Sequence, residues 1–379
     1  MTSRQAVALT FFVNGGLFAC LACRLPDIQH RWHFDDAQLG GILFSGAVGA
    51  VTGVAVAGRI CSRFGSHRIV VLSGISAATL LAFFSILPIQ ILLIPVFFLF
   101  GGCASTMDVA MNVNGVAVEK DLGKPIMSAL HGMFSLGGLS FGLVGWALLK
   151  LHATVPEHFI GVCSLFVLTL VTLYPRLLPA IPSPDSLAPA FALPDRRVVV
   201  VGLIGMCAFL CEGAMGDWSA IYLRDSLHQS PAMSAVGYLA FTLSMTSMRF
   251  GGDHLLERLG ANVALRICGT ITAVGMGLAL LVGNPITTVI GFASVGIGMA
   301  VVAPIAFSLG GKIGGDNPDH AIASIATLSY SAFLFGPALI GFIAKAESLR
   351  AALAIVVILA VAITLLSGFI DRKADMIAS

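Results

Sequence analysis

Long apolar runs are the feature that most limits what this sequence can fold into. Runs such as IVVLSGISAATLLAFFSIL (69–87) and ALAIVVILAVAITLL (352–366) recur throughout the 379 residues. A helix needs about 20 predominantly apolar residues to cross the hydrocarbon core of a bilayer. Only 11% of the residues are charged, whereas about a quarter are charged in a soluble domain. The sequence therefore predicts an all-α, multi-pass membrane protein that is surrounded by a lipid bilayer.

Charged and turn-forming residues divide the chain into candidate spans. No A-x-A-like cleavage site precedes the polar segment LPDIQHRW, so the first span is interpreted as retained rather than as a signal peptide. Twelve transmembrane helices are expected, at 5–24, 37–59, 68–87, 90–118, 126–149, 157–178, 197–222, 233–252, 262–282, 285–311, 320–344 and 349–370.

The positive charges predict the orientation of these spans. If both termini are cytoplasmic, fifteen of the 21 Lys and Arg residues fall on the inner side and six on the outer side. Cytoplasmic loops carry the excess of Lys and Arg in membrane proteins. We therefore expect both termini in the cytoplasm, with the protein in a bacterial cytoplasmic (inner) membrane.

A proline-rich segment divides the chain into two halves. IPSPDSLAPAFALPD (181–195) is the only long polar break between spans, and we interpret it as a cytoplasmic linker between halves 1–180 and 196–379. The halves resemble each other: Arg63-Phe-Gly and Arg258-Leu-Gly lie 195 residues apart, and Phe141-Gly and Phe335-Gly lie 194 apart. Repeated halves with a central site are usual in secondary transporters. Two pseudo-symmetric six-helix halves are predicted.

Several function classes are disfavoured by the sequence. The net charge is only +2, which argues against a nucleic-acid partner, and the eight cysteines lie mostly within apolar spans. No G-x-x-x-x-G-K-[S/T] nucleotide motif, metal-ligand grouping or nucleophile–base pair is seen. We expect no enzymatic activity, no cofactor, no metal site and a monomeric protein.

In its loop motifs and its two halves, the chain resembles the major facilitator superfamily. The loop Gly58-Arg-Ile-Cys-Ser-Arg-Phe-Gly-Ser-His-Arg68 is similar to that superfamily's G-x-x-x-D-R-x-G-R-R signature, with Ser62 in place of the acid. The corresponding loop of the second half keeps its acid, as Glu257-Arg258-Leu-Gly260. The resemblance covers essentially the whole chain and implies alternating access between two halves.

A narrower resemblance lies in the fourth span. Asp108-Val-Ala-Met-Asn112 is similar to the acid-x-x-x-Asn motif of fucose-permease-like proton symporters. Together with His131-Gly and Glu212-Gly, the stretch MNVNGVAVE resembles the bacterial YbjJ-like branch. Fucose permeases also carry an acid within the first helix, and the middle of this first span has none.

The fourth span carries a stripe of polar and small residues. Asp108, Asn112, Gly115 and Glu119, with Gly101 above them, follow helical spacing. An ionised Asp at the membrane centre costs about 2.5–3.5 kcal/mol on insertion scales, so such a residue faces protein or water rather than lipid. We predict that Asp108 is a proton-coupling and substrate-binding group and that Asn112 binds substrate. The alternative is an interhelical hydrogen-bond pair.

Other spans add further candidates. Glu212, flanked by Gly213 and Gly216, is a second candidate for proton coupling and substrate binding. Asn14 and Tyr330 are candidate hydrogen-bonding partners of a substrate. For Asp217 and Trp218 we prefer anchoring at the outer membrane interface.

The gating candidates lie at cytoplasmic helix ends. For Glu119 a gate salt bridge and a solvated helix end are both open, and for His131 a core position or pairing with Glu119 is preferred to proton transfer. Arg249 and Asp253, at the inner end of the eighth span, are expected to form a structural ion pair with the loop motif. The full set is Arg63, Glu119, His131, Arg249, Asp253, Glu257 and Arg258.

The sequence thus favours a proton-coupled secondary transporter of a small polar organic solute. A sugar or sugar derivative is the first hypothesis, because the Asp108/Asn112 resemblance implies it. Proton-driven efflux of an amphipathic compound is the alternative, and the fifth span lacks the proline signature typical of drug/proton antiporters. A non-transporting membrane sensor is a third possibility.

Overall fold

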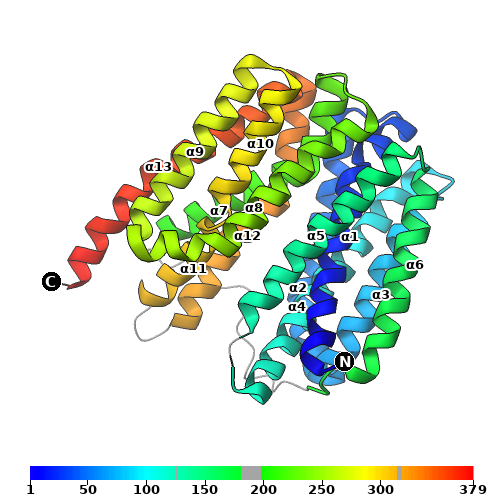
Figure 1. The fold of residues 1–379 in the computed structure, drawn as a ribbon, viewed down its shortest axis with the longest axis horizontal. Coiled ribbons are helices and arrows are strands. Elements are labelled where there is room, and N and C mark those ends of the chain that lie inside the picture. Colours follow the sequence, from blue (N-terminus) through cyan, green and yellow to red (C-terminus); the bar gives the residue numbers. More distant parts are fainter. Residues whose placement is uncertain (125, 181–197, 314–317, 379) are drawn as a thin grey trace. The chain divides into compact units, whose positions relative to one another are not determined.

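The protein is helical throughout the part that the structure describes. A computed structural model describes residues 1–124, 126–180, 198–313 and 318–378, without the side chains of 128, 251–258, 311–312, 318–319 and 370–378. All regular elements in these ranges are helices (Figure 1). The prediction of an all-α protein is therefore confirmed.

Helices α1 to α6 make up the first half of the chain. Their bounds are α1 (Ser3–Trp32), α2 (Asp36–Phe64), α3 (Ser66–Phe84), α4 (Leu93–Leu122), α5 (Met127–Lys150) and α6 (Val155–Leu173). Two of these helices begin with a capping box, in which a Thr and the residue three positions later bond each other's main chain, at Thr2–Gln5 and Thr154–Glu157.

Seven helices follow in the second half. They are α7 (Val199–Ile221), α8 (Pro231–Leu259), α9 (Ala261–Val282), α10 (Pro285–Met299), α11 (Val302–Ile313), α12 (Pro318–Ala346) and α13 (Leu349–Ala378), and α7 continues into a π-helical turn at Tyr222–Ser226. The expected tenth span is thus divided between α10 and α11. Pro304 lies in the first turn of α11, where its missing N–H is tolerated.

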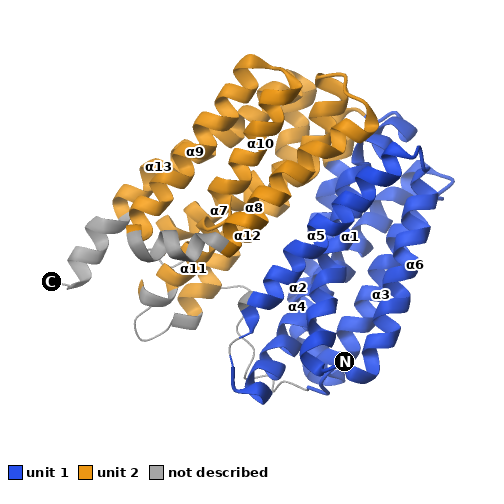
Figure 2. Ribbon diagram, in the orientation of Figure 1, with its two compact units in different colours: residues 1–34, 41–187 blue, residues 35–40, 188–379 orange. Residues whose placement is uncertain are grey.

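The chain divides into two compact units (Figure 2). Unit 1 comprises residues 1–34 and 41–187, and unit 2 comprises residues 35–40 and 188–379. Residues 35–40 group with unit 2 because they contact α12: Asp35 forms an ion pair with Lys345 (2.9 Å), and Gly40 lies against Pro337 and Gly341. The predicted linker 181–195 lies outside the described residues, so its role stays a prediction.

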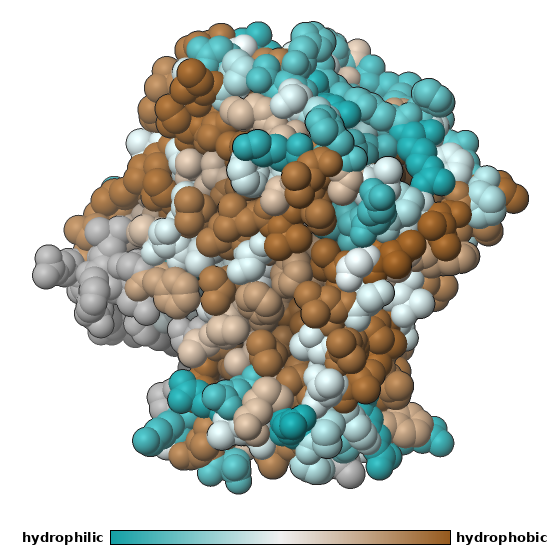
Figure 3. Space-filling view, turned by 45° about the vertical axis from the view of Figure 1, so that its right-hand side comes forward, coloured by the Kyte–Doolittle hydropathy of each residue, from teal (hydrophilic) through white to brown (hydrophobic). Residues whose placement is uncertain are grey.

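Most of the described helices are long and apolar enough to cross a bilayer. Within the described residues, eleven stretches are long and apolar enough to cross a membrane, with α10 and α11 counted as one. Helix α8 occupies the place of the remaining predicted span. On the face in Figure 3, hydrophobic side chains gather along the middle of the helices and hydrophilic ones near the helix ends.

Helix α1 is longer than the predicted span 5–24. It continues through Pro26 to Trp32, because buried polar contacts replace the expected polar loop. The Arg24 side chain, 3% exposed, donates to His158 Nδ1 (3.0 Å), to Asp27 Oδ2 (2.8 Å) and to the Ala153 carbonyl (2.8 Å). These bonds join the C-terminal part of α1 to α6 and to the residues before α6, and they satisfy a charge that burial would otherwise penalise.

Glycines allow close helix contacts in unit 1. A Cβ on Gly15 of α1 would overlap the Phe134 carbonyl of α5, and a Cβ on Gly137 of α5 would overlap the Phe12 carbonyl of α1. Helices α2 and α4 approach in the same way at Gly49. Small residues at such seams let helix backbones pack closely inside a membrane.

A buried asparagine ties together three segments of unit 1. Asn114 Nδ2 donates to Ser66 Oγ (3.1 Å) and to the Leu178 carbonyl (2.8 Å). Ser66 N in turn donates to the Ala180 carbonyl (2.8 Å). Helix α4 is thereby joined to the start of α3 and to the chain beyond α6.

We expect Asn114→Ala to lower the free energy of unfolding by about 1–3 kcal/mol, because the change leaves buried polar groups without a partner. Thermal unfolding of the purified protein in detergent measures the effect. Asn112→Ala is the matched control, since the Asn112 amide bonds only to its own helix and its loss costs less stability. Equal destabilisation by the two variants would contradict the assigned role of Asn114.

Candidate functional site

Helix α4 presents Asp108 on its more open face. Its other face is buried, with Ala104, Met107, Met111 and Asn114 packed in the interior of unit 1. Asp108 and Asn112 are half-buried. Within the part of the chain that the structure describes, the Asp108 carboxylate has no hydrogen bond and no ion pair. An intramembrane carboxylate in this state can exchange protons or bind a ligand.

Asn112 lies one turn from Asp108 on the same face. Its Nδ2 donates to the Asp108 main-chain carbonyl (2.8 Å), within the same helix. These contacts therefore do not support the alternative, in which Asp108 and Asn112 form an interhelical hydrogen-bond pair. The Asn112 side chain stays at the surface of α4, beside the carboxylate.

The predicted stripe does not extend along the whole helix. Gly101 packs against Gly46 of α2, and Gly115 packs against Met127 and Leu130 of α5. The Glu119 carboxylate accepts hydrogen bonds from Ile126 N (2.6 Å) and Met127 N (3.0 Å). Glu119 therefore caps the start of α5. Ile126 lies seven residues beyond Glu119 in the sequence, and helical spacing alone does not indicate this contact. Its gating role stays a prediction.

Asn14 of α1 lies in the interior of unit 1. Its side chain is fully buried, and Nδ2 donates to the Ala104 carbonyl of α4 (3.2 Å). The contact ties α1 to α4 one turn from Asp108. Asn14 Oδ1 has no partner among the described residues, and the substrate-binding role of Asn14 stays a prediction.

Two gating candidates of unit 1 are exposed. His131 lies on α5, with its ring edge-on to Phe11 at a centroid distance of 5.4 Å. The Arg63 guanidinium lies 5.2 Å from the centroid of the Phe64 ring at the end of α2. These contacts leave the gating assignments as predictions.

Unit 2 contains an ion pair that the sequence did not indicate. Arg249 Nη2 of α8 lies 3.5 Å from Glu212 Oε2 of α7, and the two side chains are 33% and 14% exposed. We expected Arg249 and Asp253 to form an ion pair with the loop motif, and the structure shows that Arg249 also lies beside Glu212. The side chains of Asp253, Glu257 and Arg258 lie outside the described residues, so their roles stay predictions.

Trp218 differs from its expected position. Its side chain is fully buried in unit 2, and its indole N–H has no partner within the described structure. Anchoring at the membrane interface is therefore wrong for Trp218. The sequence was misleading because a Trp near a helix end has similar sequence neighbours whether its side chain is buried or lies at the membrane interface.

Tyr330 belongs to an aromatic cluster. Its ring stacks on Phe209 of α7 (centroids 5.2 Å apart, planes 4° apart), and Phe209 also stacks on Phe333 of α12 (5.1 Å, 27°). Phe209 and Phe333 were not among the residues predicted for the site. The i, i+3 spacing of Tyr330 and Phe333 places two aromatic rings on one helix face and was a signal for Phe333.

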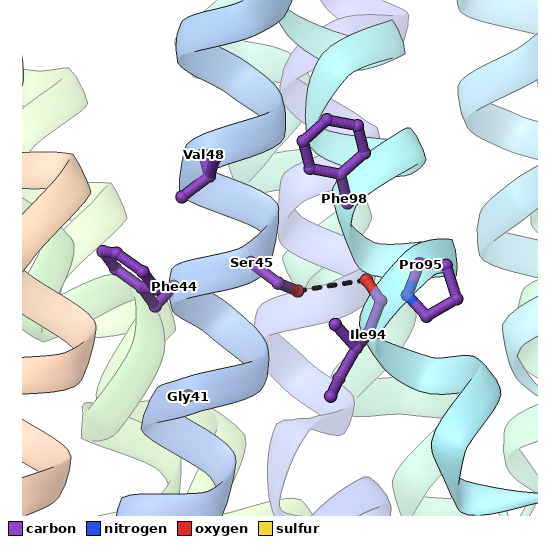
Figure 4. Close-up of a pocket in the computed structure, with 7 residues that line it drawn as sticks. All are labelled: Gly41, Phe44, Ser45, Val48, Ile94, Pro95 and Phe98. Carbon is purple, nitrogen blue, oxygen red and sulfur yellow. Dashed lines mark hydrogen bonds between the residues drawn. The ribbon is translucent and has the colours of Figure 1, made fainter.

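An apolar groove lies on unit 1, away from these residues (Figure 4). It has a volume of about 450 Å³ and is lined by α2 and α4 residues Gly41, Phe44, Ser45, Val48, Ile94, Pro95 and Phe98. The Ser45 hydroxyl donates to the Ile94 carbonyl (3.1 Å), so the only polar side chain of the lining is already bonded. The groove offers no group that could couple or recognise a polar solute.

Comparison with known proteins agrees with this architecture. The family model of the Major Facilitator Superfamily matches residues 7–332. An uncharacterised transporter of Sinorhizobium fredii, y4wD, is 32% identical over 98% of this chain and 99% of its own length. The membrane protein MosC of Rhizobium meliloti is 30% identical over 97% and 90%.

A solved structure shares the fold. The nucleoside transporter NupG, as its D323A mutant, superposes with a TM-score of 0.76 over 98% of this chain and 99% of its own, at 13% identity. The helices, the family match and the named relatives agree. The chain is a multi-pass membrane transporter and belongs to the major facilitator superfamily.

Proposed function

We propose that the chain is a proton-coupled secondary transporter of a small polar organic solute, namely a sugar or sugar derivative. In this proposal it is a monomer of twelve spans in the bacterial inner membrane, with both termini in the cytoplasm. It works by alternating access and belongs to the YbjJ-like, fucose-permease-related branch. The transported partners are the solute and protons.

The observation that carries the proposal is the unsatisfied carboxylate of Asp108. Burial favours the neutral form of a carboxyl group, whereas hydrogen-bond donors or cations favour the charged form. With no such partner among the described residues, Asp108 is free to take up a proton in the membrane. A solute that donates a hydrogen bond to Asp108, assisted by the neighbouring Asn112 amide, would bind in a way that depends on that proton.

Glu212 is the second proposed coupling group, and it is held differently. Its carboxylate has Arg249 as a counter-charge at 3.5 Å, which favours the charged form. A proton on Glu212 would weaken this ion pair. Because Asp108 has no such counter-charge among the described residues, we propose Asp108 as the main coupling group and Glu212 in a supporting role.

Uptake into proteoliposomes tests the proposal. With an acidic exterior, we expect at least one member of a panel of sugars and sugar acids to accumulate above equilibrium, and a protonophore to abolish the accumulation. Amphipathic compounds with the gradient reversed test the efflux alternative. Accumulation that survives the protonophore would reject proton coupling, and movement of amphipathic compounds alone would reject the sugar hypothesis.

A further inference from the structure

The aromatic cluster of unit 2 has an open side. Phe209 is 9% exposed, whereas Tyr330 and Phe333 are 47% and 40% exposed. The three rings are stacked within 27° of one another. We call Phe209, Tyr330 and Phe333 the ring platform. Its two α12 rings present flat aromatic surface that no part of unit 2 covers fully.

The platform lies on the face of α12 that meets protein. Tyr330 and Phe333 share a helix face with Pro337 and Gly341, which follow at i+7 and i+11 from Tyr330. Pro337 and Gly341 contact residues 36–40, at the start of α2. This face of α12 therefore makes protein contacts one and two turns beyond Phe333.

A carboxylate with unused hydrogen-bonding capacity borders the platform. Glu212 lies one turn from Phe209 on α7, and a Cβ on the next residue, Gly213, would lie 3.5 Å from the Phe333 ring. Glu212 Oε1 has no partner in the described structure. Its contact with Arg249, at 3.5 Å, is longer than the 2.7–2.9 Å of a charge-assisted hydrogen bond. A hydroxyl group of a ligand can therefore donate a hydrogen bond to the Glu212 carboxylate.

There is also local open space on α7 one turn from Glu212. A Cβ added at Gly216 would meet no atom within 4 Å, so open space lies next to this part of α7. The terminal torsion of a glutamate is broad, so the carboxylate group rotates about it at little cost. Such a rotation brings an acceptor toward this space.

From this arrangement we propose that unit 2 carries a subsite for a cyclic polyol. The ring stacks on Tyr330 and Phe333, and one of its hydroxyl groups donates to Glu212. The C–H groups on one face of a sugar or cyclitol ring are weakly positive, and the face of an aromatic ring is weakly negative. An open-chain polyol carries hydroxyl groups of the same kind but has no flat apolar face. The inference deepens the proposed function and rests on it for the transport itself.

Matched pairs of ligands test the subsite on the full-length protein. The probes are D-glucose with sorbitol, D-galactose with galactitol and D-mannose with mannitol, along with myo-inositol and the nucleoside uridine. Binding is measured by calorimetry in detergent without a proton gradient. We expect at least one ring member to bind and its open-chain partner to bind at least about tenfold more weakly.

Substitutions in α12 test which residues cause the preference for ring over open-chain polyols. Phe333→Leu is expected to reduce the ring-to-chain affinity ratio to about one, and Tyr330→Phe to retain it, because the aromatic face stays. The matched control is Phe335→Leu, since Phe335 is 58% exposed on α12 and is not part of the platform. A ratio is unaffected by a general loss of active protein, so a purely structural role of Phe333 would leave it unchanged.

The subsite is rejected if no cyclic polyol binds, if the open-chain partners bind equally well, if uridine binds while no polyol does, or if Phe333→Leu and Phe335→Leu behave alike. Ring-selective binding without gradient-driven accumulation keeps the subsite and rejects the proposed proton coupling. Gradient-driven accumulation of open-chain polyols keeps the proton coupling and rejects the subsite.

Discussion

Asp108→Asn is expected to abolish accumulation driven by a pH gradient. If one proton moves with each solute molecule, each pH unit supplies about 1.4 kcal/mol, which is about a tenfold concentration ratio. A gradient of two units thus lets the wild type accumulate solute up to about 100-fold. Asparagine preserves the shape of the side chain and cannot take up a proton, so the variant ratio should fall to about one. Uptake into proteoliposomes measures both ratios.

The comparison needs two controls. Solute exchange across the membrane without a gradient is expected to persist in Asp108→Asn, which shows that the variant is folded and binds. Asp121→Asn removes an exposed acid in the last turn of the same helix and should accumulate solute like the wild type. Accumulation by Asp108→Asn at the wild-type level would disprove the coupling role.

The helices were predictable because the membrane requires them. A chain that crosses hydrocarbon has to satisfy its own backbone hydrogen bonds, so apolar length alone placed most elements within a few residues. The exceptions depend on side chains that are distant in the sequence. Helix α1 passes Pro26 because Arg24 bonds to His158 and the Ala153 carbonyl, and no local pattern predicts that contact.

The site was predictable only where one helix defines it. Asp108 and Asn112 share α4, so their spacing placed them on one face, and the structure leaves both half-buried. The partners of the other polar residues come from different helices. Glu212 and Arg249 are 37 residues apart on α7 and α8, and the spacing within either helix does not indicate which side chains of the other helix it meets.

The largest loss of stability is expected at the seam between α1 and α5. In Gly137→Ala the new methyl group would overlap the Phe12 carbonyl of α1, a backbone atom that cannot move without its helix. Overpacking a core by a single group commonly costs about 1–3 kcal/mol, and here both helix backbones have to separate. We therefore expect a loss of about 3 kcal/mol in the free energy of unfolding, measured by thermal or denaturant unfolding in detergent.

Gly161→Ala supplies the same chemical change without the overlap. Gly161 lies within α6, and a Cβ there would meet no atom within 4 Å. Alanine is favoured over glycine inside a helix by roughly 0.5–1 kcal/mol, so this variant should match the wild type or exceed its stability. The sign of the effect thus separates helix propensity from packing. Equal stability of Gly137→Ala and Gly161→Ala would contradict the close contact of α1 and α5 at Gly137.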